Sequence, residues 1–282
     1  METVNASYPG NRKHSIDTGG QCMAMKKNAS ILMALLSPAL LASTASAQDA
    51  GQKSVDNGTD PSKLLTVAEA KYEYLDLMGG FGTGTLRLSY TQPFGEKQDY
   101  AVRLRVPLTY VDVLGNDSYD LGDASIEATH VFGLSRQGAF VAKGELVFDT
   151  AGRPELGTGQ NVFKGTFIYA RFLKGGSIFA PAIVQSNSLW GNDDRAEVNF
   201  TTFDFYYVPK MKDPRNLVTF DPSLNFDWEN HKRFAGLAVT FGRVLGPQLG
   251  GNGIVFVKPS LFAGSERSGD WGMEVGYKVI GF

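Results

Sequence analysis

From residue 71 onward, apolar and polar side chains alternate in short stretches that are separated by clusters of Gly, Pro, Asn, Asp and Ser. A period of two residues is typical of β-strands, whereas an amphipathic helix repeats about every 3.6 residues. We find no helical repeat of any length in this region. The alternation predicts twelve strands, which are Lys71–Leu77, Gly84–Gln92, Tyr100–Asp112, Ala124–Leu134, Gly138–Thr150, Asn161–Leu173, Ser177–Asn187, Val198–Lys210, Asn216–Trp228, Phe234–Leu245, Ile254–Ala263 and Trp271–Phe282.

The predicted connections between these strands alternate in length. PFGEKQ, LSRQG, KGG and MKDPR are mostly tight turns, whereas GNDSYDLGD, TAGRPELGTGQ and SLWGNDDRAE are longer loops. Bacterial outer-membrane barrels have an even number of strands, short periplasmic turns and longer extracellular loops. We therefore expect an all-β fold over residues 71–282, a single antiparallel transmembrane β-barrel of about 12 strands.

The two faces of each strand differ in chemistry. In the third predicted strand, Leu104, Val106 and Leu108 share one face, and Arg103 and Arg105 share the other. In a barrel, the apolar face contacts lipid and the charged face lines a hydrated lumen. A secreted β-sandwich with an ordinary core remains the alternative. The charged faces predict the lumen lining, which is Arg87, Arg103, Arg105, Glu127, Lys143, Glu145, Asp149, Arg171, Asp204, Asp221, Asp227, Lys258 and Glu274.

Both signs of charge occur in this predicted lining, and two readings stay open. Charges in a lumen set the selectivity of a channel, or they pair across the interior and fill it. Barrels of about 8 strands are filled by side chains, and those of about 16 leave an aqueous channel. Twelve strands predict a narrow or partly obstructed passage. The sixth and seventh predicted strands are apolar on both faces, so their orientation is not readable.

The first 47 residues predict an upstream extension followed by a cleaved signal peptide over residues 25–47. Lys26-Lys27 form its positive start, Ile31 to Ala42 its apolar centre, and Ala45-Ser46-Ala47 a cleavage site of small residues. The apolar centre is too short for a transmembrane helix, which needs about 20 residues. An exported protein is therefore expected.

Residues 48–70 are polar and rich in Gly and Asp, which predicts a mobile periplasmic leader. The chain has one cysteine, Cys22, which lies upstream of the predicted cleavage site and excludes a disulfide framework. Its 27 Lys plus Arg against 29 Asp plus Glu, without a basic block, argue against a nucleic-acid partner.

The sequence ends on an aromatic residue, Phe282, directly after an alternating strand. A terminal aromatic on a last strand resembles the signal by which the barrel assembly machinery recognises its substrates. The apolar row runs through Val279 to Gly281, so Phe282 is one position out of phase, which a bulge would correct. We expect the assembly machinery and outer-membrane lipid as partners.

Four stretches, YDLGDASIEATHVFGL, FDTAGRPELGTGQNVF, DPSLNFDWE and KPSLFAGSERSGDWGMEVGYKVIGF, resemble the transporter family named for the MetA pathway of phenol degradation. The resemblance covers most of the mature chain. Its marks are Leu121-Gly122-Asp123, the loop at residues 152–159 and Gly269-Asp270-Trp271. The resemblance implies an outer-membrane β-barrel that passes small, often aromatic or hydrophobic, compounds.

Catalytic chemistry is weakly represented. His130 and His231 are the histidines downstream of the predicted cleavage site, and an esterase needs one of them beside a nucleophilic Ser. No G-x-S-x-G motif occurs. We therefore expect no enzyme, no cofactor and no metal site, but a channel for passive uptake of a small-molecule solute. A non-conducting structural or surface-interaction barrel is the second hypothesis, and an outer-membrane lipid hydrolase is the third.

Overall fold

The computed structural model describes residues 56–79, 81–113 and 116–282. The predicted upstream extension, the signal peptide and residues 48–55 lie outside the described residues. Within them the strands are β1 (Val67–Leu77), β2 (Phe81–Phe94), β3 (Tyr100–Val113), β4 (Asn116–Leu121), β5 (Ser125–Phe132), β6 (Gly138–Val147), β7 (Gln160–Phe172), β8 (Ile178–Gly191), β9 (Asn199–Val208), β10 (Asn216–Asp227), β11 (Lys232–Gln248), β12 (Gly251–Ala263) and β13 (Gly269–Ile280). One short 3-10 helix, η1 (Pro154–Leu156), precedes β7.

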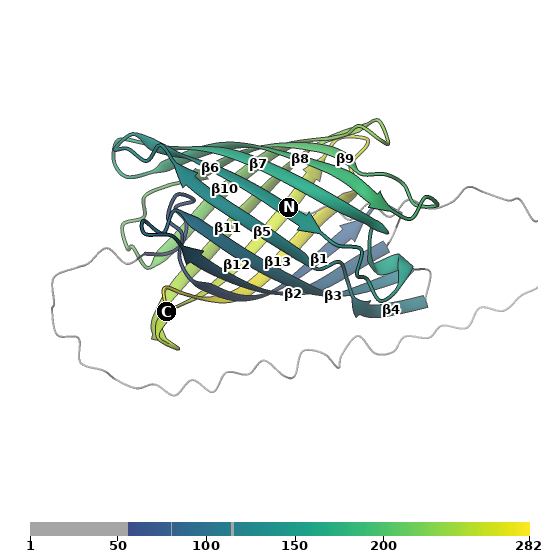
Figure 1. Ribbon diagram of the computed structural model, residues 1–282, viewed down its shortest axis with the longest axis horizontal. Helices are drawn as coiled ribbons and strands as arrows, with labels where there is room; N and C mark the ends of the chain where they lie inside the picture. Colours follow the sequence, from purple (N-terminus) through teal and green to yellow (C-terminus); the bar gives the residue numbers. More distant parts are fainter. Residues whose placement is uncertain (1–55, 80, 114–115) are drawn as a thin grey trace, which may run out of the picture. The chain divides into compact units, whose positions relative to one another are not determined.

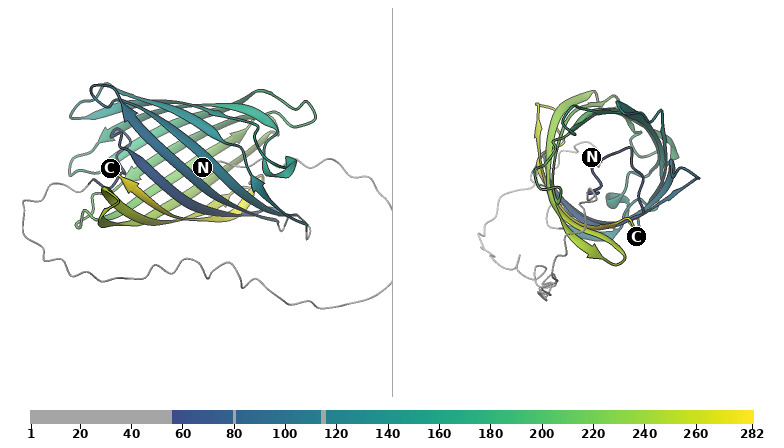
Figure 2. Two further views of the ribbon diagram at one scale, coloured as in Figure 1. Left: turned by 60° about the horizontal axis from the view of Figure 1, so that its bottom comes forward. Right: turned by 90° about the vertical axis from the view of Figure 1, so that its left-hand side faces the viewer.

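The strands form one sheet that closes on itself (Figures 1 and 2). Every neighbouring pair is antiparallel, and β1 pairs with both β2 and β13, which joins the first and last strands. Closure gives each of these strands except β4, which pairs with β3 alone, a hydrogen-bonding neighbour on each side, as a strand needs when lipid offers no substitute partner. A β-sandwich has two sheets packed face to face, so the sandwich alternative is wrong and the predicted closed barrel is confirmed. None of the described helical residues makes a segment long and apolar enough to cross a membrane.

Strands β4 and β5 together occupy one of the twelve positions in the barrel. Leu121 of β4 lies opposite Leu108, and Ser125 of β5 lies opposite Arg105, so three steps along β3 match four steps along β4 and β5. The extra residue is a bulge at Gly122-Asp123-Ala124. The stretch GNDSYDLGD, which was expected to be a loop, therefore contains a strand.

The boundary between leader and barrel also differs from the expectation. Strand β1 begins at Val67 rather than at Lys71, and its first residue already pairs with Ile280. The alternation is hard to see there because inward Val67 is apolar, whereas the outward positions are the small residues Ala68 and Ala70. Residues 56–66 precede β1 and lie against the inner wall of the barrel, as described below.

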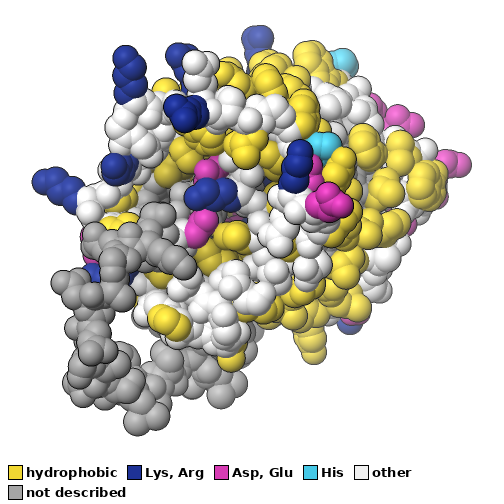
Figure 3. Space-filling view, turned by 60° about the vertical axis from the view of Figure 1, so that its left-hand side comes forward, with side chains coloured by type: hydrophobic (Ala, Val, Ile, Leu, Met, Phe, Trp, Pro, Cys, Tyr) yellow, Lys and Arg dark blue, Asp and Glu magenta, His cyan; other side chains and the backbone are white. Residues whose placement is uncertain are grey.

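The apolar rows face outward. On β3, Leu104 is 51% exposed, whereas the neighbouring Ala101 on the opposite face is 2% exposed. The same outward pattern holds along β2, with Leu88, and along β12, with Leu261. In Figure 3, hydrophobic side chains cover the flank of the barrel, and charged side chains gather around a hollow. This outer surface is the apolar band that a lipid bilayer requires.

The C-terminal aromatic residue reaches the outer face by a turn rather than by a bulge. Gly281 has φ of +70°, in the left-handed region that favours glycine. The turn lets Phe282 lie 6.4 Å, between ring centroids, from Tyr90, whose side chain is on the outside. The backbone N–H of Gly281 donates to the carbonyl oxygen of Thr66. The mismatch in phase is thereby resolved at a single glycine.

Candidate functional site

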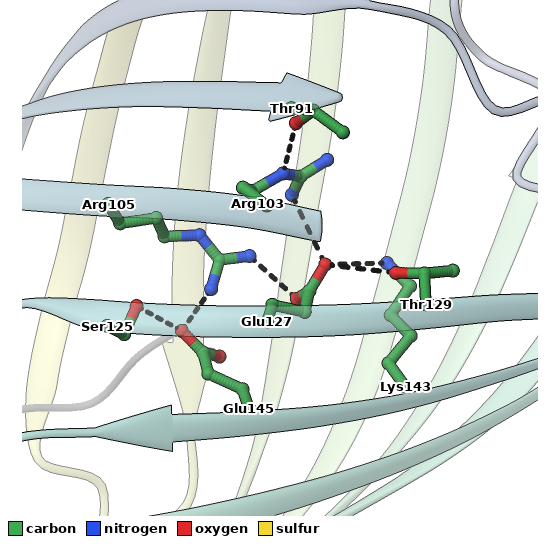
Figure 4. Close-up of polar contacts among 8 residues, drawn as sticks. All are labelled: Thr91, Arg103, Arg105, Ser125, Glu127, Thr129, Lys143 and Glu145. Carbon is green, nitrogen blue, oxygen red and sulfur yellow. Dashed lines mark hydrogen bonds and ion pairs between the residues drawn. The ribbon is translucent and has the colours of Figure 1, made fainter. Parts of the chain in front are cut away.

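The inner wall carries a network of charged side chains on β3, β5 and β6 (Figure 4). Arg105 donates from Nη2 to Oε2 of Glu127 at 2.8 Å, and from Nη1 to Glu145. Arg103 and Lys143 each lie 3.8 Å from Oε1 of Glu127. Three cations therefore surround two carboxylates on one patch of the wall.

The register of the three strands explains this arrangement. Glu127 of β5 lies directly opposite Glu145 of β6, a like-charge pair that is destabilising by itself. Arg105, from the neighbouring strand, lies between the two carboxylates and compensates both. Ser125 donates to Glu145 at 2.5 Å, and Thr129 donates to Glu127 at 3.4 Å. The two buried acids are thus compensated by charge and by hydrogen bonds, as buried carboxylates must be.

A second set of ion pairs lies on the inner faces of other strands. These pairs are Lys71–Glu274 at 2.7 Å, Arg87–Glu73 at 3.8 Å and Lys258–Asp221 at 3.5 Å. Glu73 and Glu274 also face each other across β1 and β13. Here too, a like-charge pair in register is compensated by a cation from a nearby inward position. The inner surface is polar and charged around much of its circumference.

Most of the predicted lumen positions face inward. They are Arg87, Arg103, Arg105, Glu127, Lys143, Glu145, Asp204, Asp221, Asp227, Lys258 and Glu274. Asp227 is the last residue of β10, where its carboxylate accepts from the backbone N–H of Asn230 at 3.0 Å and from Nδ2 of Asn230 at 2.9 Å. Its contacts are therefore those of a residue that shapes the β10–β11 turn.

Two predicted lumen residues do not lie on the inner wall. Arg171 is in phase with Phe167 and Tyr169, which are exposed on the outer face, and it is itself exposed. The inner row of β7 contains Thr166 instead. Asp149 is exposed in the connection that follows the end of β6. The Arg171 error arises because β7 is apolar on both faces, and the Asp149 error because β6 is shorter than its alternation suggests.

Several inward charges were missed by the sequence reasoning. Glu69, Lys71 and Glu73 form a charged inner row on β1, and Lys278 lies opposite Glu69. In the stretch KYEYLDL, charged residues alternate with tyrosines, and this alternation predicts most of the charged inner row. Tyr206 also faces inward, and its hydroxyl group donates to the carbonyl oxygen of Thr59 at 3.3 Å.

The lumen contains residues 56–66, which we call the lumen segment (Figure 2). Leu64 packs against an inner-wall cluster of Val131, Ala139 and Val141 on β5 and β6. The next residue, Leu65, packs against a cluster on β10, β11, β12 and β13. Consecutive leucines therefore contact different parts of the wall, and the segment bridges the lumen.

A cavity of about 390 Å³ remains beside the lumen segment. Its lining combines the segment with inward residues of many strands, among them Arg103, Lys143, Asp204, Asp221 and Lys278. A smaller cavity of about 140 Å³ lies next to Arg103 and Arg105. The interior is therefore narrowed, but it is not filled completely.

At the end of the barrel that carries the β6–β7 loop, two of the sequence marks lie in contact. Oδ2 of Asp123 accepts from the backbone N–H of Thr158 at 2.8 Å, and Oδ1 accepts from the N–H groups of Thr150 and Ala151. Gly157 approaches Asp123 so closely that an added Cβ would lie 2.7 Å from its Oδ1. The loop that contains η1 is fixed to the bulge between β4 and β5.

Replacing Asp123 with Ala should loosen this loop. The substitution leaves the backbone N–H groups of Ala151 and Thr158 without their acceptor, whereas the N–H of Thr150 still donates to the carbonyl oxygen of Phe148. Hydrogen bonds to a charged group each contribute about 1.5–3 kcal/mol. We expect faster protease cleavage within residues 148–159 of the folded protein, measured by mass spectrometry. Asp193→Ala, in another exposed loop, is the control. Equal cleavage of the two variants would contradict the proposed role of Asp123.

The histidines offer no catalytic constellation in the described part of the chain. His130 lies between Tyr100 and Phe132, with ring centroids 4.2 and 5.4 Å away. His231 lies in the β10–β11 turn with φ of +53°. Among the described residues, neither histidine makes a hydrogen bond to a serine. The same residues contain no group of three metal-ligating side chains.

No protein-family model matches the chain. No curated protein matches it either. Among solved structures, the fold is similar to the COG4313 outer membrane channel from Pseudomonas putida F1, with a TM-score of 0.60 and 11% identity over 80% of this chain and 99% of that chain. It is also similar to the KdgM porin, with a TM-score of 0.52 and 8% identity over 76% and 98%. The chain has the fold of outer-membrane β-barrel channels.

Proposed function

We propose that the protein is an outer-membrane channel for the passive uptake of small organic solutes. The observation that carries this proposal is the polarity of the closed barrel, which is apolar outside and charged inside around a cavity of about 390 Å³. A barrel whose interior served only to stabilise the fold would not need inward ion pairs, because burying charged groups costs desolvation energy. A charged lumen is what a hydrated passage requires.

We further propose membership of the transporter family named for the MetA pathway of phenol degradation, with small aromatic or hydrophobic compounds as the implied solutes. The contact between Asp123 and the loop at residues 152–159 supports this assignment, because it gives two of the sequence marks a shared structural role. The fold supports a location in the outer membrane. The outward position of Phe282 supports its recognition by the barrel assembly machinery.

Planar bilayers and liposomes test the channel proposal. Purified protein should give discrete current steps in a planar bilayer and should speed the swelling of liposomes in small organic solutes. Heat-denatured protein, added at the same concentration, is the control. Absence of both current and swelling, from protein that still shows a heat-modifiable gel shift, would contradict the proposal.

A non-conducting barrel is the second candidate, and one observation favours it. The lumen segment bridges the interior through Leu64 and Leu65, and the wall charges pair with each other. The cavity beside the segment favours conduction instead. The effect of removing the segment, considered in the Discussion, distinguishes the two candidates.

A further inference from the structure

The cavity in the lumen has walls of different charge. Arg103 and Lys143, from β3 and β6, line one arc, and Asp204 and Asp221, from β9 and β10, line another. Strands β7 and β8 separate the two arcs on one side, and the remaining strands separate them on the other. The charges of opposite sign therefore reach the cavity from different parts of the wall.

On the basic arc, the cations extend further into the lumen than the acids that pair with them. The side chain of Arg103 is 32% exposed and that of Lys143 is 25% exposed, whereas their partner Glu127 is 7% exposed. Glu127 also lies outside the cavity lining. With Arg105 and Glu145 included, the patch has three cations and two acids. Its surface is therefore positive where a solute would touch it.

On the acidic arc, the balance is reversed. Asp204 and Asp221 share one nearby cation, Lys258, which lies 3.5 Å from Asp221. Asp204 has no hydrogen bond to any described residue. The other charged residues of the cavity lining are two acids and two cations: Glu69 lies opposite Lys278, and Asp60 and Lys63 belong to the lumen segment. The acidic arc therefore keeps one negative charge that faces the cavity.

We propose that this cavity is a binding site for small zwitterions, solutes that carry a carboxylate and an ammonium group at separate positions. The carboxylate would lie at Arg103 and Lys143, and the ammonium group at Asp204. Charges in a narrow lumen of low effective dielectric attract strongly, and a solute with both charges gains at both arcs. The inference rests on the proposed channel function, and it names a solute class that differs from the aromatic or hydrophobic compounds implied by the family resemblance.

The reversal potential of single channels in a KCl gradient tests the charge arrangement. Asp204→Asn should shift selectivity toward chloride, and Arg103→Gln should shift it toward potassium. Lys143→Gln, which keeps Arg103 in place, should shift it in the same direction as Arg103→Gln. Arg171→Gln is the control, because Arg171 faces outward, and should leave the reversal potential unchanged.

Liposome swelling with γ-aminobutyrate tests the substrate class against an uncharged amide of similar size. The wild type should admit the zwitterion faster than the amide, and this ratio should fall toward one in both Asp204→Asn and Arg103→Gln. A wild-type ratio of one, or shifts of the same sign in the two variants, would overturn the proposal while the channel function stands. Absence of any current or swelling would overturn both.

Discussion

Deleting residues 56–65 is expected to raise the single-channel conductance several-fold. The deletion removes the lumen segment except for Thr66, whose carbonyl oxygen accepts from the N–H of Gly281, and it leaves β1 intact. Current through a narrow passage grows with its open cross-section, and the segment crosses that passage between Leu64 and Leu65. Planar-bilayer recordings at fixed salt concentration measure the change.

A double substitution, Leu64→Ser with Leu65→Ser, should have a similar effect without a change in chain length. A fully buried leucine contributes about 1.5–3 kcal/mol, and these two are only partly buried. Ordering the backbone of each residue costs about 1–2 kcal/mol. The free energy that holds the lumen segment against the wall is therefore small, and loss of both leucines should release the segment from the wall.

Leu249→Ser is the matched control for this double substitution. Leu249 lies in the β11–β12 turn and is 83% exposed, so its loss should leave the conductance unchanged. If the deletion and the double substitution both keep the wild-type conductance, the lumen segment does not limit the passage. If both abolish current in a folded barrel, the segment forms part of the conducting path rather than an obstruction.

Replacing Glu127 with Gln is expected to destabilise the barrel by about 3–5 kcal/mol, the usual cost of removing one partner from a buried ion pair. Glu127 is 6% exposed and lies close to Arg103, Arg105 and Lys143. Without its charge, three neighbouring cations repel one another beside the single remaining carboxylate of Glu145. The midpoint of urea unfolding in lipid vesicles, followed by tryptophan fluorescence, measures the loss.

Glu96→Gln is the control for this substitution. Glu96 is exposed in the β2–β3 turn, and a surface change of this kind usually alters stability by no more than about 0.5 kcal/mol. Equal unfolding midpoints for the two variants would show that lumen water, rather than Glu127, screens the three cations. The network of Figure 4 would then be irrelevant to stability.

The alternation along β3 made the fold and much of the lining predictable from sequence. When a strand has a charged row and an apolar row, as with Arg103 and Leu104, a closed barrel in lipid places the charged row inside and the apolar row outside. Individual ion pairs were not predictable, since they depend on register. The placement of Glu127 opposite Glu145, with Arg105 between them, follows from three strands whose mutual offsets are fixed by turns and by the bulge before Ser125.

The failure at β7 has a specific physical cause. Its inner row includes Ile168, which packs with the cluster that holds Leu64 of the lumen segment. The inner wall is apolar where it contacts the lumen segment, and the outer wall is apolar where it faces lipid. Strand β7 therefore has apolar residues on both faces. The sequence predicts a polar leader over residues 48–70, and within residues 56–66 the pair Leu64-Leu65 is the one apolar signal for a position inside the barrel.

Block of current by a thiol reagent tests most directly whether the charged interior is the conducting path. Thr166 lines the cavity, and the next residue, Phe167, is 45% exposed on the outer face. The mature chain is expected to lack cysteine, so Thr166→Cys and Phe167→Cys each provide a single reactive site. A bulky, membrane-impermeant methanethiosulfonate should reduce the current of Thr166→Cys and leave that of Phe167→Cys unchanged. Unreduced current in labelled Thr166→Cys would contradict the account.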